Sequence, residues 1–138
     1  MNLINKVINW YKTTKRPWGY YIVHEDYPHH KMKTLVLKPG KSISLQRHSH
    51  RDEWWFIVSG KGLMIRDGHR TQLYGGGTDA YNIPAMQWHK LTNESETEDL
   101  VVFEMQLGRR CVEQDIERWP VDVPFKAYPM PATTKKKD

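Results

Sequence analysis

Between Trp18 and Leu107 the chain is a succession of short runs rich in Val, Ile, Tyr, Trp and Thr, each closed by a turn residue. Glycine, proline or an Asp-Gly pair follows each run, which is the pattern of strands joined by tight turns. Because no helical stretch separates the runs, they predict an all-β antiparallel sandwich or barrel. The predicted strands are Trp18–His24, Met32–Lys38, Ile43–His48, Trp54–Val58, Leu63–Arg66, Thr71–Tyr74, Asp79–Ile83, Gln87–Leu91 and Leu100–Gln106.

The segments that flank this region have different patterns. Leu3, Val7, Ile8 and Trp10 follow Asn2 at helical spacing, which predicts a short N-terminal helix that ends before Pro17. Residues 113–118 are compatible with a helical turn, and prolines and lysines from Pro120 onward are typical of an extended tail. At 138 residues the chain has the size of one domain. We therefore expect a helix over 1–14, a barrel over 15–119 and a tail over 120–138.

Composition excludes several function classes. The longest apolar run, Trp54–Val58, is far too short to cross a membrane, and no signal-peptide core precedes Lys6. The single cysteine, Cys111, cannot form an internal disulfide, which favours a cytoplasmic protein. The net charge is +5, and part of it is a terminal lysine run. Since the aromatic residues do not follow a basic stripe, we expect a small anionic ligand and no nucleic acid or membrane partner.

Two polar segments indicate a metal site. Gln46, His48 and His50 alternate along a predicted strand and would point to one face, and Glu53 follows just after a bend. In the second segment, His89 begins a strand after a proline turn. Imidazole, carboxylate and amide groups together can hold a divalent cation. Taken alone, the first segment is more typical of polar side chains near a loop than of a metal site, and the second is more typical of a half-buried histidine than of a ligand.

The spacing of these segments resembles the two motifs of the cupin superfamily. Gly40, Gln46, His48, Glu53 and Gly60 reproduce the first motif, with Gln46 in place of its first histidine. Pro84, His89 and Asn93 reproduce most of the second, with Met86 where glycine is usual. The resemblance implies a small antiparallel β-barrel, a jelly-roll-like double-stranded β-helix. It also implies one interior divalent metal ion (Zn, Mn, Fe, Co or Ni) held by Gln46, His48, Glu53 and His89.

A closer resemblance is to the type II, cupin-type mannose-6-phosphate isomerases, over about residues 15–119. It is carried by Arg16-Pro17-Trp18-Gly19, by SISLQRHSHRDEWW at residues 42–55, by Glu104-Met105-Gln106 and by EQDIER at residues 113–118. The implied activity is metal-dependent conversion of mannose 6-phosphate to fructose 6-phosphate by proton transfer through a cis-enediol.

The same resemblance implies roles for further residues. Glu104, on the strand that the family keeps beside the pocket, is one candidate for the catalytic base. His50, which would face the same side as His48, and a metal-bound hydroxide are the others. The sugar phosphate would be bound by cations that match basic positions of the family motifs, namely Lys33, Arg51 and Arg118. Because cupins commonly associate through their sheets, a homodimer is expected as well.

The chain departs from the isomerase pattern at three places. Trp54 replaces the histidine that usually follows the metal-binding glutamate, and Trp119-Pro120-Val121 continues where the family has Tyr-Gly-Arg. No nucleotidyltransferase domain precedes the barrel, so GDP-mannose synthesis is not expected. The first two departures motivate an alternative, a non-catalytic cupin that binds a sugar or sugar phosphate. An Fe(II)-dependent oxygenase on the same barrel is a further alternative, since one fold hosts many chemistries.

Overall fold

The computed structural model of the chain describes residues 13–125, and every regular element in this part is a β-strand. No helix that could cross a membrane occurs among these residues. The strands are β1 (Thr13–Arg16), β2 (Gly19–Asp26), β3 (His30–Leu37), β4 (Gln46–Arg47), β5 (Arg51–Ser59), β6 (Lys61–Arg66), β7 (His69–Tyr74), β8 (Ala80–Ile83), β9 (His89–Asn93), β10 (Leu100–Gly108) and β11 (Glu117–Arg118).

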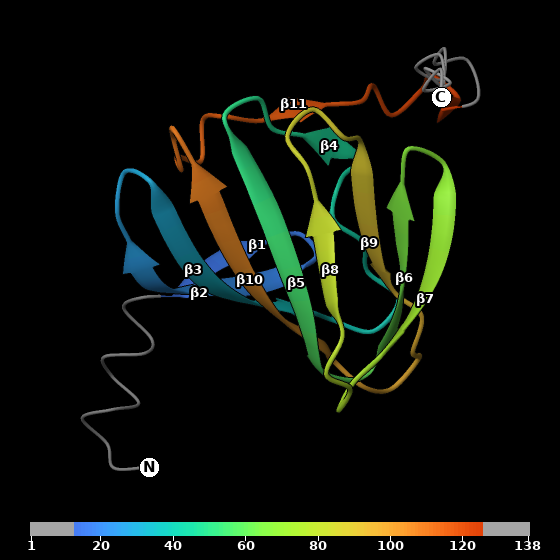
Figure 1. The fold of residues 1–138 in the computed structure, drawn as a ribbon. Helices are drawn as coiled ribbons and strands as arrows, with labels where there is room; N and C mark the ends of the chain where they lie inside the picture. The colour runs from blue at the N-terminus through green and yellow to red at the C-terminus, as the bar shows by residue number, and fades with distance from the viewer. Residues whose placement is uncertain (1–12, 126–138) are drawn as a thin grey trace, which may run out of the picture.

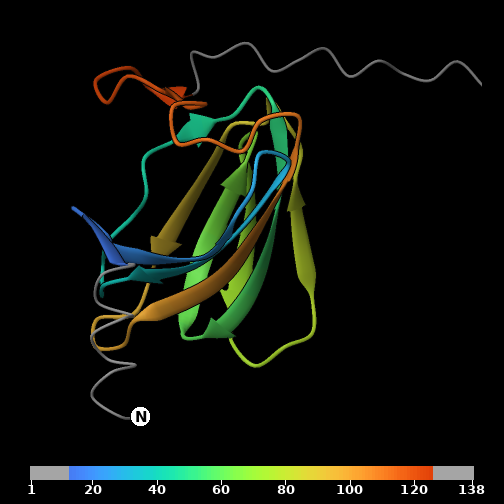
Figure 2. The same cartoon turned by 90° about the vertical axis from the view of Figure 1, so that its left-hand side faces the viewer.

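The strands form two antiparallel sheets that face each other. One sheet has the order β1-β2-β3-β10-β5-β8, and the other has the order β11-β4-β9-β6-β7. Figure 1 shows the sheets closing around a common interior, with β4 and β11 at one end, and Figure 2 shows the same arrangement turned by 90°. Each of the nine predicted runs contains or overlaps a strand from β2 to β10. The all-β prediction is confirmed.

Two local predictions need correction, and a third falls mostly outside the described residues. The N-terminal helix falls mostly outside the described residues, although Thr13 and Thr14, within its predicted bounds, begin strand β1. The helical turn over 113–118 is wrong, because Glu117 and Arg118 form strand β11 and pair with Arg47 and Gln46 of β4. The predicted strand 43–48 is much shorter than expected, since β4 contains only two residues.

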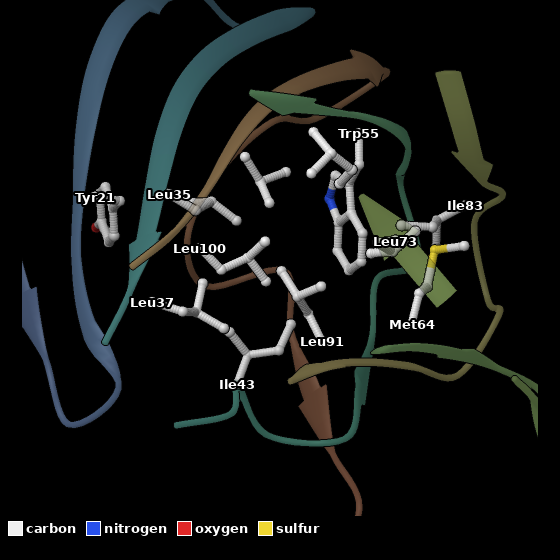
Figure 3. Close-up of a cluster of buried hydrophobic side chains, with 12 residues drawn as sticks. Tyr21, Leu35, Leu37, Ile43, Trp55, Met64, Leu73, Ile83, Leu91 and Leu100 are labelled. Atoms are coloured by element: carbon white, nitrogen blue, oxygen red, sulfur yellow. The ribbon is translucent and has the colours of Figure 1, made fainter. Parts of the chain in front are cut away.

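Inward-facing side chains change from polar to apolar along four strands. At the end nearest β4 and β11, polar side chains occupy the interior. Further along the same strands apolar side chains replace them and form the core in Figure 3. The sequence alternation of each strand sends every second residue inward. The inward series are Lys31, Lys33, Leu35, Leu37 in β3; Arg51, Glu53, Trp55, Ile57 in β5; His89, Leu91 in β9; and Gln106, Glu104, Val102, Leu100 in β10.

The loop from β8 to β9 has a strained residue beside the polar end. Met86 has φ of 69°, a left-handed conformation that side chains with a Cβ adopt at a cost. Its backbone N–H donates to the carbonyl of His48 at 2.7 Å, which ties this loop to the residue after β4. Half of the Met86 side chain is exposed, so its packing contributes little. This geometry explains why the motif usually has glycine here.

Replacing Met86 by glycine is expected to stabilise the protein by about 0.5–1 kcal/mol, because relief of the left-handed strain exceeds the added freedom of the unfolded chain. Urea unfolding monitored by tryptophan fluorescence measures the change. Met86→Ala is the matched control, because alanine removes the side chain but keeps the strained Cβ. A Met86→Gly variant no more stable than Met86→Ala would contradict this account.

Candidate metal centre

Three of the four predicted metal ligands converge at the polar end of the barrel. His48 follows β4, Glu53 lies in β5 and His89 begins β9. Oε1 of Glu53 lies 3.0 Å from Nε2 of His48 and 3.3 Å from Nε2 of His89. All three side chains are buried, and their candidate ligand atoms lie within 4.8 Å of one another. His48 and Glu53 are close in the sequence, whereas His89 lies on a strand of the sheet opposite that of Glu53 and meets Glu53 across the interior.

Backbone carbonyls orient both imidazole rings. Nδ1 of His48 is 2.7 Å from the carbonyl oxygen of Asp115, and Nδ1 of His89 is 2.9 Å from that of Gln87. Since a carbonyl only accepts, each Nδ1 carries a proton and donates, and each Nε2 faces Glu53. Such an outer contact is typical of metal-ligating histidines.

The converging atoms fit a divalent cation. Glu53 Oε1 and His89 Nε2 are buried and have no hydrogen-bond partner among the described residues. Buried polar atoms without a partner are costly, so a ligand at this point would satisfy them. Two neutral imidazole nitrogens and one carboxylate oxygen suit zinc, iron, manganese, cobalt or nickel. Burial alone would raise the pKa of Glu53, but the nearby His48 and His89 rings hold it well below its usual range.

Gln46, the fourth predicted ligand, lies beside this cluster. It pairs with His89 across β4 and β9 and lines the same cavity. Its Oε1 accepts a hydrogen bond from Ser44 Oγ at 3.0 Å. The amide oxygen is therefore already oriented by a hydroxyl group.

A cavity of about 550 Å³ opens beside the three ligands. Of the residues predicted to act in the site, seven line it, and His89 adjoins it through Glu53. The polar and charged residues of the lining are Arg16, Lys33, Ser42, Ser44, Gln46, His48, Arg51, Glu53, Lys90, Glu104, Glu113 and Arg118. Sequence reasoning assigned no role to Arg16, Lys90 or Glu113. Arg16 and Glu113 belong to two of the sequence motifs that resemble the isomerase family, so those motifs could have indicated them. No motif or spacing pointed to Lys90.

His50 lies apart from the cavity. It is exposed and is not among the residues that line it. The predicted alternation of Gln46, His48 and His50 stops after two residues because β4 ends at Arg47 and a bend follows. The backbone N–H of His50 instead donates to the carboxylate of Asp115 at 3.0 Å.

Glu104 lies at the inner wall of the cavity. The indole N–H of Trp55 donates to its Oε2 at 3.0 Å, and the amide N–H of Gln106 donates to its Oε1 at 2.7 Å. These two donors fix the carboxylate in one orientation. Burial, and then the Glu53 carboxylate, raise the pKa of Glu104, although Lys33 opposes the shift.

Two buried lysines share one carboxylate at the cavity wall. Nζ of Lys33 lies 2.6 Å and Nζ of Lys31 3.0 Å from Oε1 of Glu113. Lys33 also lies 4.2 Å from the centroid of the Tyr21 ring. Burial alone would lower the pKa of Lys33, but Glu104 and Glu113 outweigh it and raise the pKa. Burial alone would raise the pKa of Glu113, but the two lysines outweigh this effect and lower it to about 2.

The segment 112–116, which we call the strap, holds the loop that carries His48 in place. Its carboxylate at Asp115 accepts hydrogen bonds from the backbone N–H groups of Ser49 and His50. Nη1 of Arg51 donates to the carbonyl of Val112 at 2.9 Å. Nη2 of Arg51 lies 3.4 Å from Nε2 of His48 and 3.8 Å from Oε2 of Glu53, so this predicted phosphate ligand sits deep beside the metal ligands.

Two motif residues, Asn93 and Trp54, have contacts or orientations that are unrelated to the candidate metal site. Asn93 is buried, and its side chain donates to the carbonyls of Leu37 and Glu98 and accepts from the N–H of Ser95. Trp54 lies between Glu53 and Trp55, which both point inward, so its side chain points away from the site. The replacement of the family histidine by Trp54 therefore leaves the ligand cluster unchanged.

Comparison with known proteins shows the family of this chain. Residues 4–120 match the family described as "Mannose-6-phosphate isomerase C-terminal". The chain belongs to this family. It is 34% identical over 110 residues to the xanthan biosynthesis protein XanB of Xanthomonas campestris and 37% identical over 103 residues to the alginate biosynthesis protein AlgA of Pseudomonas aeruginosa. These matches cover 80% and 75% of this chain but only 23% and 21% of the relatives. The chain thus spans about a fifth of the curated relatives' length.

A solved structure confirms the cupin fold. A conserved protein of Klebsiella pneumoniae with a double-stranded β-helix domain matches with a TM-score of 0.63 at 18% sequence identity. The match covers 76% of this chain and 82% of that one. At this identity the likeness concerns the fold alone.

The protein is expected to bind one divalent cation per chain, and His89→Ala is expected to weaken that binding more than 100-fold. Loss of an outer contact alone costs about 10–100-fold, so loss of a ligand costs more. Metal content after dialysis and the rise of the unfolding temperature with added Co²⁺ or Zn²⁺ measure this. His69→Ala, at an exposed position of β7, is the control and should bind like the native chain. Equal binding by both variants would exclude the cluster as the metal site.

Glu113 is expected to make the protein sensitive to acid. Its folded-state pKa of about 2 lies below the unfolded value of about 4.3, so its stabilisation is present above pH ~4.3 and is lost as the pH falls toward 2. Glu113→Gln should therefore be less stable at neutral pH and lose less stability across that window. Unfolding temperatures at a series of pH values test this, with the exposed Glu96→Gln as control. A parallel loss in Glu113→Gln and the native chain would contradict it.

Proposed function

We propose that this chain is a metal-dependent aldose–ketose isomerase that converts mannose 6-phosphate to fructose 6-phosphate. The observation that carries the proposal is the cavity itself, which is lined by two members of the buried His-Glu-His cluster, by the oriented carboxylate of Glu104 and by several cations. The family match supports the reaction class.

The charge of the cavity favours a dianionic substrate. Its lining holds three carboxylates, those of Glu53, Glu104 and Glu113, and five cations, those of Arg16, Lys33, Arg51, Lys90 and Arg118. Two positive charges are therefore uncompensated, and a bound divalent cation would add to them. A phosphate monoester at neutral pH carries a charge of about −1.5 to −2, which would offset this excess.

The phosphate would be bound near the cavity mouth. Arg16 and Arg118 are exposed and line the cavity, as does the half-buried Lys90. Arginine side chains bind phosphate oxygens with paired N–H donors. Of the predicted phosphate ligands, Arg118 is therefore the best placed, whereas Lys33 and Arg51 are already bonded to the strap.

Glu104 would carry the proton between the two carbons. In an aldose–ketose conversion a proton leaves C2 of the open-chain sugar, a cis-enediol forms, and a proton returns to C1. A base must lie within hydrogen-bond reach of that proton, and Glu104 is an oriented carboxylate in the cavity. A bound divalent cation supplies Lewis-acid stabilisation of the charge that develops on the sugar oxygens.

The test is a coupled assay of mannose 6-phosphate turnover by protein reconstituted with each candidate metal. We expect turnover by the native chain, loss below detection in a His48→Ala/His89→Ala variant, and a loss of at least about 100-fold in kcat for Glu104→Gln, within the range of general-base contributions. His50→Ala is the matched control and should retain activity. In deuterated water, the product should gain deuterium wherever the transferred proton exchanges with solvent.

The alternatives predict different results. Sugar-phosphate binding by metal-loaded protein, without turnover of any hexose 6-phosphate pair, would replace the isomerase with a binding protein. Loss of activity in His50→Ala with full activity in Glu104→Gln would exchange the roles of these two residues.

A further inference from the structure

The hydroxyl group of Tyr21 belongs to the cavity wall and has a proton to donate. Tyr21 is only 6% exposed, and it lines the cavity together with Arg16 and Lys33. Its hydroxyl oxygen accepts a hydrogen bond from Nη2 of Arg16 at 3.3 Å. A phenol group can donate as well as accept. Among the described residues the Tyr21 proton has no acceptor, so it is available to a ligand.

The ring of Tyr21 also contacts two positive charges. Cζ of Arg16 lies 5.2 Å and Nζ of Lys33 4.2 Å from the ring centroid. An aromatic ring attracts cations at such distances. Tyr21 therefore holds Arg16 both by its hydroxyl group and by its ring. A side chain that is held in place before a ligand arrives loses less entropy when the ligand binds.

Arg16 has no acidic partner in the part of the chain that the structure describes. Its Nη1 donates to the carbonyl of Lys15 at 3.0 Å, and its Nη2 donates to Tyr21. Lys33, by contrast, is already paired with Glu113. An anion that enters the cavity would therefore meet Arg16 without competing with a carboxylate of the protein.

The turn that follows Arg16 is packed closely against β3. Gly19 has φ of 149°, and a Cβ at this position would overlap the carbonyl oxygen of Val36. The carbonyl of Trp18 accepts a hydrogen bond from the backbone N–H of Lys38 at 2.9 Å. Because glycine permits this close approach, the hairpin of β1 and β2 is fixed to the barrel. The backbone that carries Arg16 is fixed with it.

Tyr21 lies two strands away from the oriented carboxylate of Glu104. Glu104 of β10 is opposite Lys33 of β3, and β2 is the next strand of the sheet. At about 4.8 Å per strand, the backbones at Tyr21 and Glu104 are about 10 Å apart. Figure 3 shows Tyr21 and Trp55, the donor to Glu104, on opposite sides of the buried cluster. A sugar phosphate with its reacting carbons near Glu104 can therefore extend toward Tyr21 and place its phosphate at Arg16.

We propose that Tyr21 is a positioning residue for the phosphate group of the substrate. It holds Arg16 where the guanidinium can pair with phosphate oxygens, and it donates its own proton to the same group. The inference rests on the proposed function, because that function supplies the phosphate monoester. Since this contact is remote from the reacting carbons, it would stabilise the bound substrate and the transition state equally, and so lower KM without raising kcat.

Binding of a reduced substrate separates this inference from isomerase activity. Mannitol 6-phosphate has no carbonyl group and cannot isomerise, and titration calorimetry of the metal-loaded protein measures its affinity. Tyr21→Phe keeps the ring and removes the hydroxyl group. It should weaken binding about 10-fold or more, within the range for hydrogen bonds to charged groups.

Tyr20→Phe is the matched control. Tyr20 is the preceding residue of the same strand, so its side chain points to the other face of the sheet and does not line the cavity. It has a cation contact of its own, because Nζ of Lys38 lies 5.4 Å from its ring centroid. This variant should bind mannitol 6-phosphate like the native chain. Unchanged metal content and unfolding temperature would confirm that both variants are folded.

A double-mutant cycle tests whether Tyr21 acts together with Arg16. Tyr21→Phe combined with Arg16→Gln should lose less affinity than the product of the two single losses, because both changes remove parts of one contact. In an active isomerase, Tyr21→Phe should raise KM for mannose 6-phosphate by about the factor seen in binding and change kcat less than about twofold.

Several outcomes would overturn the inference. They are a native chain that binds mannitol 6-phosphate no better than mannitol, unchanged affinity in Tyr21→Phe, an equal loss in Tyr20→Phe, and single losses that multiply in the double variant. A fall in kcat at constant KM would do the same. Phosphate binding that depends on Tyr21, without turnover of mannose 6-phosphate, would instead support this inference and exclude the isomerase.

Discussion

Burying several charges inside a small barrel is the constraint on which this structure depends. Lys31, Lys33, Arg51, Glu53 and Glu104 are almost fully shielded from solvent at one end of the interior. Isolated charges there would be very costly, so each must be paired or bonded. The strap supplies many of these partners: its carbonyls accept from His48 and Arg51, and Glu113 neutralises both lysines. The barrel and the strap are therefore a single electrostatic unit.

The apolar half of the same interior makes this arrangement possible. Trp55 belongs to both halves, since its ring packs in the core and its indole N–H fixes the Glu104 carboxylate. Its ring also meets the edge of His89, with centroids 5.6 Å apart. Packing against the core thus restricts the side-chain conformations of the candidate ligands, because a close-packed core leaves few alternative rotamers. Glu53 and His89, which lie on strands, are therefore held more firmly than residues on loops.

Much of this was predictable from sequence, because strand alternation is a local property. The runs gave the strands from β2 to β10, and the motif spacing identified His48, Glu53 and His89. His50 was misplaced because alternation was extended beyond a strand that pairs for only two residues. The roles of Glu113 and Asp115 were missed because their contacts join residues more than sixty positions apart. No periodic pattern within one segment encodes such contacts.

The pairing of Glu113 with Lys33 has a consequence for ligand recognition. An anion that reaches Lys33 Nζ meets a tethered carboxylate already in place at 2.6 Å. A tethered group competes at an effective concentration of the order of millimolar or above. An anion would therefore bind Lys33 only in competition with Glu113, which favours ligands that carry more charge or make additional contacts. Glu113 therefore acts as an internal competitor for Lys33, and the affinity of an anion for this lysine would depend on how well it displaces the Glu113 carboxylate.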